Sequence, residues 1–269
     1  MPTLAIRDFE VHWSATGSGP AVVCLHDTAT DGRCWDPLVA ALDGSCHTVV
    51  YDRRGWGRSS APETYLATTV VEQAEDARAV AAAALDGPAV LCGAGLGAVI
   101  CLELAASDPR RWPAVIAIEP PLFAFSHVAT EQLSADRAAI DAVARSRGPA
   151  AVARTYLDGE LPGLGPAAGR TPTDLQQPAV DRPLAVFAEL GSVPAWPLRF
   201  DRLRAVGRSV YPVYGADASP LLAGAARMLV ERAGTAKPLV TDPGLPHWAH
   251  AAELAELVAS VARRALAAR

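Results

Sequence analysis

Gly93-Ala94-Gly95-Leu96-Gly97 is the stretch that decides the fold, because its three glycines stand between two segments of different character. Residues 89–92 form a short apolar run that predicts a buried strand, and residues 96–106 follow a helical pattern. A strand and a helix joined this closely need glycine where their backbones approach each other. The stretch therefore predicts a sharp turn from strand to helix.

The alternation of strand and helix extends along the chain in both directions. Apolar runs bounded by loops predict strands at 21–25, 47–51, 114–118 and 210–214, and helical patterns cover 70–85 and the C-terminal end. Near the beginning, apolar residues alternate from Leu4 to Trp13, which predicts a hairpin-like start. This order predicts an α/β fold, in which helices flank a mostly parallel, twisted sheet.

The rhythm changes between residues 122 and 195. Helical stretches at 131–145 and 150–157 alternate there with pieces rich in proline and glycine. We interpret this segment as an inserted helical cap, or lid. The domain organisation that we expect is an α/β core of residues 1–121 and 196–269, with the cap at 122–195.

Composition limits the classes of function. The chain has 269 residues, a net charge of -5 and no run of lysine or arginine, so we expect no nucleic acid as a partner. Its start is charged and its apolar runs fall short of a membrane span, so we expect a cytoplasmic protein without membrane contact. We also expect no cofactor and no metal, since neither a dinucleotide motif nor a CxxC pair is present.

Four stretches in chain order carry a resemblance to a known family. They are Leu25-His26-Asp27, Asp52-Arg53-Arg54-Gly55-Trp56-Gly57-Arg58-Ser59, the glycine stretch at 93–97, and Pro243-Gly244-Leu245-Pro246-His247. Over nearly its whole length the chain resembles the α/β-hydrolase superfamily, in particular its small esterase-like members. The resemblance implies an α/β-hydrolase fold with 93–97 as the nucleophile elbow. It also implies an oxyanion hole formed by N–H groups near Thr28 and on Leu96.

Two departures from the family pattern fall in this implied site. Gly95 stands where the family has its serine, so hydrolysis through an acyl-enzyme is not expected. Asp27 stands where the family has the glycine of His-Gly, and its carboxylate would repel a developing alkoxide. An artificial knockout of the serine would not explain both changes. We therefore favour natural repurposing over a knockout. The retained acid/base residues argue against a degenerate protein, and a serine restored at position 95 would show how much machinery remains.

The implied catalytic histidine is His247, whose ordinary pKa suits proton transfer near neutral pH. Two acids could orient it. We favour Glu119, in Ile118-Glu119-Pro120-Pro121, because it matches the family's nearest relatives, and we hold Asp217 in reserve because it is one residue out of the usual register. Asp27 faces the same implied cleft, so Asp27 and His247 could share the acid and base work.

An apolar ligand suits the residues expected around this cleft. We expect Trp35, Phe123 and Trp248 to line it, together with Thr28, Gly95 and Leu96 at the elbow. Our leading hypothesis is an enzyme without a serine nucleophile that cyclises, eliminates or isomerises a hydrophobic small molecule of secondary metabolism, or hydrolyses it through water. Two alternatives stay open: a binding protein with a degenerate site, and an ester or lactone hydrolase in which His247 activates water. A homodimer is an assembly that the sequence allows.

Overall fold

The computed structural model describes residues 2–122, 127–165, 170–197 and 199–267. Within them, eight strands form one sheet in the order β1-β2-β4-β3-β5-β6-β7-β8. β2 runs antiparallel to β1 and β4, and the remaining neighbours are parallel, so the expected starting hairpin and parallel sheet are confirmed. The strands are β1 (Thr3–Ile6), β2 (Phe9–Thr16), β3 (Ala21–Leu25), β4 (His47–Tyr51), β5 (Val90–Ala94), β6 (Val115–Ile118), β7 (Val210–Gly215) and β8 (Leu239–Thr241).

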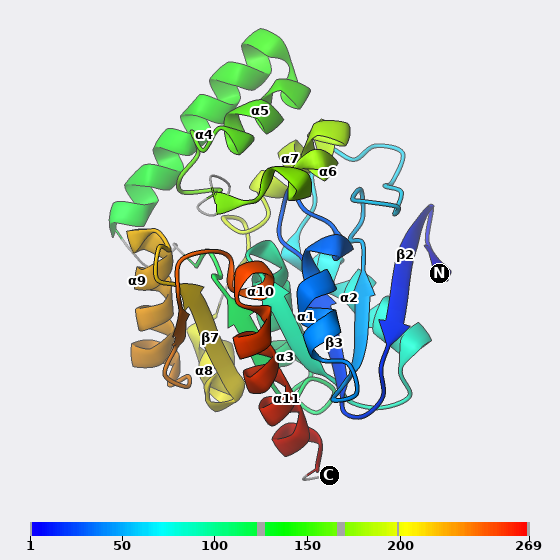
Figure 1. Ribbon diagram of the computed structural model, residues 1–269. Coiled ribbons are helices and arrows are strands. Elements are labelled where there is room, and N and C mark those ends of the chain that lie inside the picture. The colour runs from blue at the N-terminus through cyan, green and yellow to red at the C-terminus, as the bar shows by residue number, and fades with distance from the viewer. Residues whose placement is uncertain (1, 123–126, 166–169, 198, 268–269) are drawn as a thin grey trace.

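Helices cover both faces of the sheet (Figure 1). One face packs against α1 (Asp36–Ala41) and α11 (Ala251–Ala267), which bury leucine and valine side chains against β3, β5 and β6. The other face packs against α2 (Val70–Ala84), α3 (Leu96–Ser107), α8 (Phe200–Val206) and α9 (Pro220–Met228). The short helix α10 (Pro246–Ala249) precedes α11. The α/β architecture expected from the alternating pattern is confirmed.

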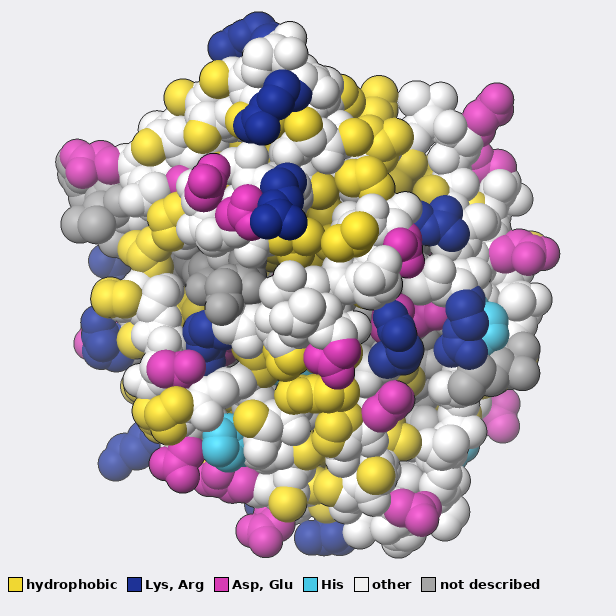
Figure 2. All heavy atoms as spheres, turned by 45° about the horizontal axis from the view of Figure 1, so that its top comes forward, with side chains coloured by type: hydrophobic (Ala, Val, Ile, Leu, Met, Phe, Trp, Pro, Cys, Tyr) yellow, Lys and Arg dark blue, Asp and Glu magenta, His cyan; other side chains and the backbone are white. Residues whose placement is uncertain are grey.

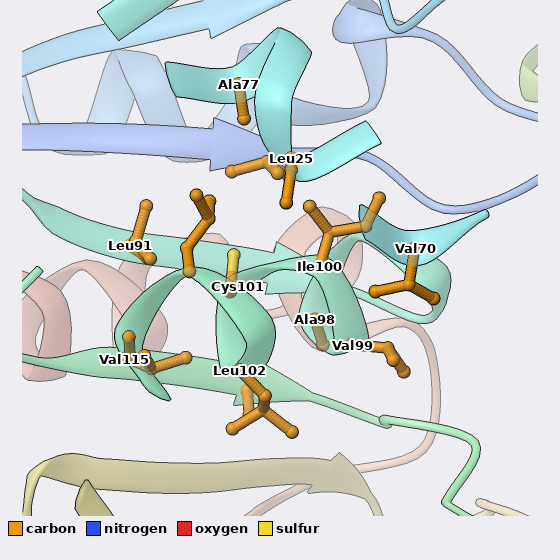
Figure 3. Packing of buried hydrophobic residues seen from close by; sticks show 14 of the residues in the cluster. Leu25, Val70, Ala77, Leu91, Ala98, Val99, Ile100, Cys101, Leu102 and Val115 are labelled. Atoms are coloured by element: carbon orange, nitrogen blue, oxygen red, sulfur yellow. The ribbon is translucent and has the colours of Figure 1, made fainter. Parts of the chain in front are cut away.

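The helix α3 lies at the centre of the larger core. Its residues from Leu96 to Leu102 are all buried, and Figure 3 shows Ala98 to Leu102 among side chains of the sheet (Leu25, Leu91 and Val115) and of α2 (Val70 and Ala77). A helix that is apolar all round is stable only when it is enclosed on every side. None of the described helices is long and apolar enough to cross a membrane.

The segment between β6 and α8 is helical, as expected, and lies above the sheet in Figure 1. Its helices α4 (His127–Arg147), α5 (Val152–Leu157), α6 (Gln177–Asp181) and α7 (Pro183–Leu190) share an apolar cluster with Trp56 and Tyr65 of the core loops. Figure 2 turns this region forward and shows hydrophobic side chains between isolated acidic and basic ones. We keep the name cap for residues 122–195, and its bounds stay a prediction.

Candidate active site

The elbow joins β5 to α3 at the carboxyl edge of the sheet, where ligand sites of α/β folds gather. Gly95 has φ 52° and ψ −119°, a backbone conformation that side chains rarely adopt. A Cβ at Gly93 would lie 2.5 Å from the carbonyl oxygen of Gly97, and one at Gly97 would lie 2.1 Å from that of Leu25. The sharp turn expected from the glycines is confirmed, and Gly93 and Gly97 each meet a backbone that leaves no room for a side chain.

The carboxylate of Asp27 occupies the position that the family resemblance assigns to the oxyanion hole. Its Oδ1 accepts hydrogen bonds of 2.8 Å from the backbone N–H groups of Thr28 and of Leu96. These are the two donors that the sequence implied. A negative oxygen of the protein itself therefore holds the position where a hydrolase would stabilise a substrate oxyanion.

Asp27 and Gly95 fit each other. A Cβ at Gly95 would lie 1.9 Å from Oδ1 of Asp27 and 2.2 Å from its Oδ2. The carboxylate thus fills the space where the serine side chain of a hydrolase would begin. Glycine is the residue that this arrangement requires at position 95.

His247 comes from α10 and is buried, with 4% of its surface exposed. Its imidazole packs against the indole of Trp35, with ring centroids 4.8 Å apart, and its Nδ1 has no hydrogen-bond partner among the residues that the structure describes. Burial, followed by the positive charge of Arg170, lowers the pKa of His247 to about 4. The histidine is therefore neutral at neutral pH.

Neither of the two expected acids is hydrogen-bonded to His247. Both oxygens of Glu119 accept from Nη1 of Arg170, at 2.9 and 2.7 Å, and Asp217 accepts from the Nε and Nη2 of the same arginine. Glu119 also accepts from the N–H of Gly215. Arg170 thus corrects the expected pairing, because it holds both carboxylates in ion pairs, and within the described part of the chain no carboxylate is hydrogen-bonded to the imidazole.

Asp27 has the opposite shift from His247. Desolvation by burial raises its pKa to about 6, although the two N–H groups of Thr28 and Leu96 and the charge of Arg53 favour the ionised form. The usual order of these two residue types is reversed here. The carboxyl group of Asp27 holds a proton more tightly than the imidazole of His247.

A small cavity of about 20 Å³ lies between Asp27 and His247, with room for about one water molecule. Gly95 and the apolar side chains of Ala94, Ile118 and Leu245 contribute to its wall. The cavity brings together Asp27, His247, Gly95 and Glu119, as the sequence implied.

The expected aromatic wall is not on this cavity. Trp35 is fully buried behind His247, and Trp248 is half-buried and packs on the apolar cluster beside α11. Phe123 lies outside the described residues. Trp35 therefore packs against the imidazole of His247 in the core, which corrects its expected place on the ligand surface. Among the described residues, no group of three or more His, Cys, Asp or Glu side chains is placed to hold a metal ion.

The loop after β4 is fixed as its motif suggested. Asp52 accepts hydrogen bonds from the N–H groups of Gly32 and Arg58, and a Cβ at Gly57 would lie 2.6 Å from this carboxylate. The charged groups of the motif do connect neighbouring loops, and the glycines allow the close approach.

A sequence model of the alpha/beta hydrolase family matches residues 22–261. The chain belongs to this family. It is 30% identical to the 2-(acetamidomethylene)succinate hydrolase of Mesorhizobium japonicum over 239 residues, which cover 86% of this chain and 83% of that protein.

Solved structures show the same fold. An esterase from Thermogutta terrifontis matches with a TM-score of 0.71 at 19% identity, covering 98% of this chain and 97% of the other. The enol-lactonase from Burkholderia xenovorans LB400 matches with a TM-score of 0.68 at 20% identity, covering 97% and 99%. These proteins are named as hydrolases, and this chain is a member of an enzyme superfamily.

Sequence reasoning missed two residues that shape the site, Arg170 and Glu189. Both lie in the cap and make their contacts with residues far away along the chain. Neither residue stands in a motif. The sequence offered one indirect signal, for Arg170: Glu119 and Asp217 would need a positively charged partner if they were buried.

Proposed function

We propose that this member of the alpha/beta hydrolase family is an enzyme that acts without a serine nucleophile, with Asp27 and His247 as its acid/base pair. The observation that carries the proposal is the carboxylate of Asp27 in the oxyanion hole, beside a glycine that leaves it room. The substrate class that we propose is a small hydrophobic molecule, such as an intermediate of secondary metabolism. Ala94, Ile118 and Leu245 form the apolar part of the cavity wall, and the cavity must widen from about 20 Å³ to admit such a molecule.

The filled oxyanion hole argues against acyl transfer. A tetrahedral intermediate needs free N–H donors at the position of its oxyanion, and both donors are engaged with Asp27. A second negative oxygen placed there would meet the carboxylate at close range. A reaction that moves protons and builds no oxyanion in this position avoids that repulsion.

The two pKa values assign the roles within the pair. A base is most effective when its pKa is near the working pH, and about 6 for Asp27 meets this condition better than about 4 for His247. Asp27 therefore takes the proton, and the neutral imidazole of His247 donates or accepts a hydrogen bond. The family resemblance implied that His247 is the base, whereas in this proposal Asp27 is the base.

The proton cycle is closed within the site. Among the described residues, the two hydrogen bonds to the carboxylate reach Oδ1, so Oδ2 is the oxygen left for the substrate, and it too lies 2.2 Å from the position of a Cβ at Gly95. Oδ2 takes a proton from an acidic C–H or O–H of the substrate, whose electron pair forms the new bond or double bond. Asp27 then returns the proton to another atom of the product. Isomerisation, elimination and cyclisation all fit this scheme.

Two chromogenic compounds test the proposal. The ring of 5-nitrobenzisoxazole opens when a base removes one proton from carbon, whereas 4-nitrophenyl acetate requires acyl transfer. We expect the protein to open the ring, with a loss of about 100-fold or more in Asp27→Asn, and to give no burst of 4-nitrophenol. Asp31→Asn is the matched control, because Asp31 is a buried aspartate of the same loop that caps a helical turn at Arg33. Equal rates in the protein and in Asp27→Asn would contradict the proposal.

Hydrolysis by activated water is the second candidate. The named relatives are hydrolases, and the cavity between Asp27 and His247 has room for about one water. Reaction of a lactone in ¹⁸O-labelled water separates the two, since hydrolysis alone places solvent oxygen in the product. A folded protein that turns over neither the lactone nor the ring compound, and yet binds apolar aromatic ligands, would favour a binding protein instead.

A further inference from the structure

Glu189 is a buried carboxylate that the cap helix α7 inserts into the core. Its side chain has no exposed surface. Oε1 accepts from Nη1 of Arg53, Nε1 of Trp56 and Nε2 of Gln73, at 2.5, 2.8 and 3.0 Å. Oε2 accepts from Nη2 of Arg53 at 3.1 Å and from Oγ1 of Thr28 at 2.8 Å. A buried charge with this many donors is fully satisfied.

Two of these donors belong to the loop that carries Asp27 or hold it directly. Thr28 gives its hydroxyl proton to Glu189 and its backbone N–H to Asp27. Arg53 gives its Nε–H to the carbonyl oxygen of His26, at 3.0 Å. Glu189 is thus connected to the loop of Asp27 through one intervening residue, which is Thr28 in one case and Arg53 in the other.

The ring of His26 completes the support. The backbone N–H of Arg53 donates to its Nε2 at 2.9 Å, so the ring proton lies on Nδ1, which donates to the carbonyl oxygen of Asp27 at 2.8 Å. The backbone before and after the carboxylate is therefore fixed by residues that Arg53 and Glu189 hold in place.

The same pair acts on Asp27 through charge. The positive charge of Arg53 lowers the pKa of Asp27, and the negative charge of Glu189 raises it. Because the pair is buried, water screens these effects little. A change at Glu189 must then alter the proton affinity of Asp27 as well as its position.

We propose that Glu189 is a positioning residue for Asp27, through which the cap holds the carboxylate in the oxyanion hole. The proposal rests on the proposed role of Asp27 as the acid/base group. It makes the cap part of the catalytic apparatus, since the loop of Asp27 is held in place by a residue of α7.

The test is the titration of Asp27 itself, followed by the ¹³C chemical shift of its side-chain carboxyl carbon and assigned with Asp27→Asn. In Thr28→Val the loop loses its hydrogen bond to Glu189, so the N–H of Thr28 holds Oδ1 of Asp27 less well. The carboxylate of Glu189 also loses one donor, so its negative charge acts more strongly on Asp27. Both effects raise the midpoint, by about half a pH unit. Glu189→Gln removes the negative charge and leaves Arg53 unbalanced, which lowers the midpoint by about one unit.

Thr48→Val is the matched control. It makes the same chemical change in a buried threonine near the amino end of β3 and β4, whose hydroxyl has no hydrogen-bond partner in the described ranges. We expect a change of less than about 0.2 unit. A general loss of packing around Asp27 would shift its titration midpoint in the same direction in both variants. Opposite shifts in Thr28→Val and Glu189→Gln would exclude that explanation. If Glu189→Gln does not fold, Thr28→Val decides alone. Midpoints equal to that of Thr48→Val would overturn the proposal.

The outcome is separate from that of the proposed function. The titration needs no substrate, so it can succeed even if Asp27→Asn leaves ring opening of 5-nitrobenzisoxazole unchanged. In that case Glu189 would position a carboxylate that is not catalytic. Unshifted titrations together with a loss of activity in Asp27→Asn would leave the proposed function standing and remove the role of Glu189.

Discussion

Asp27 and Gly95 form one unit at the scale of single residues. The sequence identified both departures from the family pattern, and the resemblance placed both near the oxyanion hole. It did not reveal that the carboxylate fills that hole, because the bond from the N–H of Leu96 to Oδ1 depends on the conformation of a loop. The structure also changes the meaning of a restored serine, since a side chain at position 95 meets Asp27.

A double-mutant cycle measures this fit. Gly95→Ser should lower the free energy of unfolding by about 3 kcal/mol, from the backbone strain at φ 52° and from overlap with Asp27. In a background of Asp27→Gly the overlap disappears, and the cost of the serine should fall by about 1–2 kcal/mol. Urea denaturation of the four proteins gives the coupling. Strictly additive costs would show that the two positions are independent.

The two shifted pKa values have opposite effects on stability in acid. The pKa of His247 is lowered from 6.5 to about 4, so its stabilising contribution is present above pH 6.5 and is lost as the pH falls through 4. The pKa of Asp27 is raised from 3.8 to about 6, so its contribution is present below pH 3.8 and is lost as the pH rises through 6. Between pH 7 and 4.5 the two contributions nearly cancel.

When one of the two groups is replaced, the pH dependence of stability shows the contribution of the other group alone. From pH 7 to 4.5, Asp27→Asn should lose about 2 kcal/mol more stability than the unmodified protein, and His247→Phe should lose about 2 kcal/mol less. Denaturant midpoints at the two pH values give these differences. The same pH dependence in all three proteins would mean that neither group has a shifted pKa.

Strands and helices followed from the sequence wherever a pattern was long enough. The predicted runs at 21–25, 47–51 and 210–214 became β3, β4 and β7. β8 has three residues, one of them exposed and one partly exposed, so its burial pattern is too short to distinguish it from a loop. The acid that pairs with His247 was predicted from family position alone. It failed because Arg170 competes for both carboxylates.

The contact between β3 and α3 gives a prediction for these elements. In Gly97→Ala the new methyl group would lie 2.1 Å from the carbonyl oxygen of Leu25, so α3 must move away from β3. We expect a loss of about 2–3 kcal/mol in unfolding free energy. Gly87→Ala is the control, because nothing lies within 4 Å of a Cβ there, and it should change stability by less than about 1 kcal/mol. Thermal denaturation compares the two, and equal midpoints would contradict the close approach.

At the scale of the whole molecule, the cap is joined to the core through two ion-pair groups. Glu189 forms an ion pair with Arg53, which holds the loop of Asp27. Arg170 forms ion pairs with Glu119 and Asp217 near His247. The sequence predicted a helical cap but could not predict these joints, because each pairs residues that are far apart in the chain. Each of the two ion-pair groups lies close to a proposed catalytic residue.

Arg170→Met tests the second joint. It leaves Glu119 buried without its partner, which should cost about 3 kcal/mol. It should also raise the pKa of His247, since the charge of Arg170 lowers it. Imidazole NMR signals follow the titration. Arg154→Met removes an exposed ion pair of the cap with Asp158, and it should change neither quantity. An unchanged pKa of His247 in Arg170→Met would contradict this picture.

The most direct test of the account is the pH dependence of ring opening of 5-nitrobenzisoxazole. If Asp27 is the base, the rate should rise with pH to a plateau, with a midpoint at about 6, and this limb should be missing in Asp27→Asn. His247→Gln should lower the plateau and keep the midpoint below neutral pH. A limb near pH 6 that persists in Asp27→Asn would show that another group removes the proton, and the central role of Asp27 would be wrong.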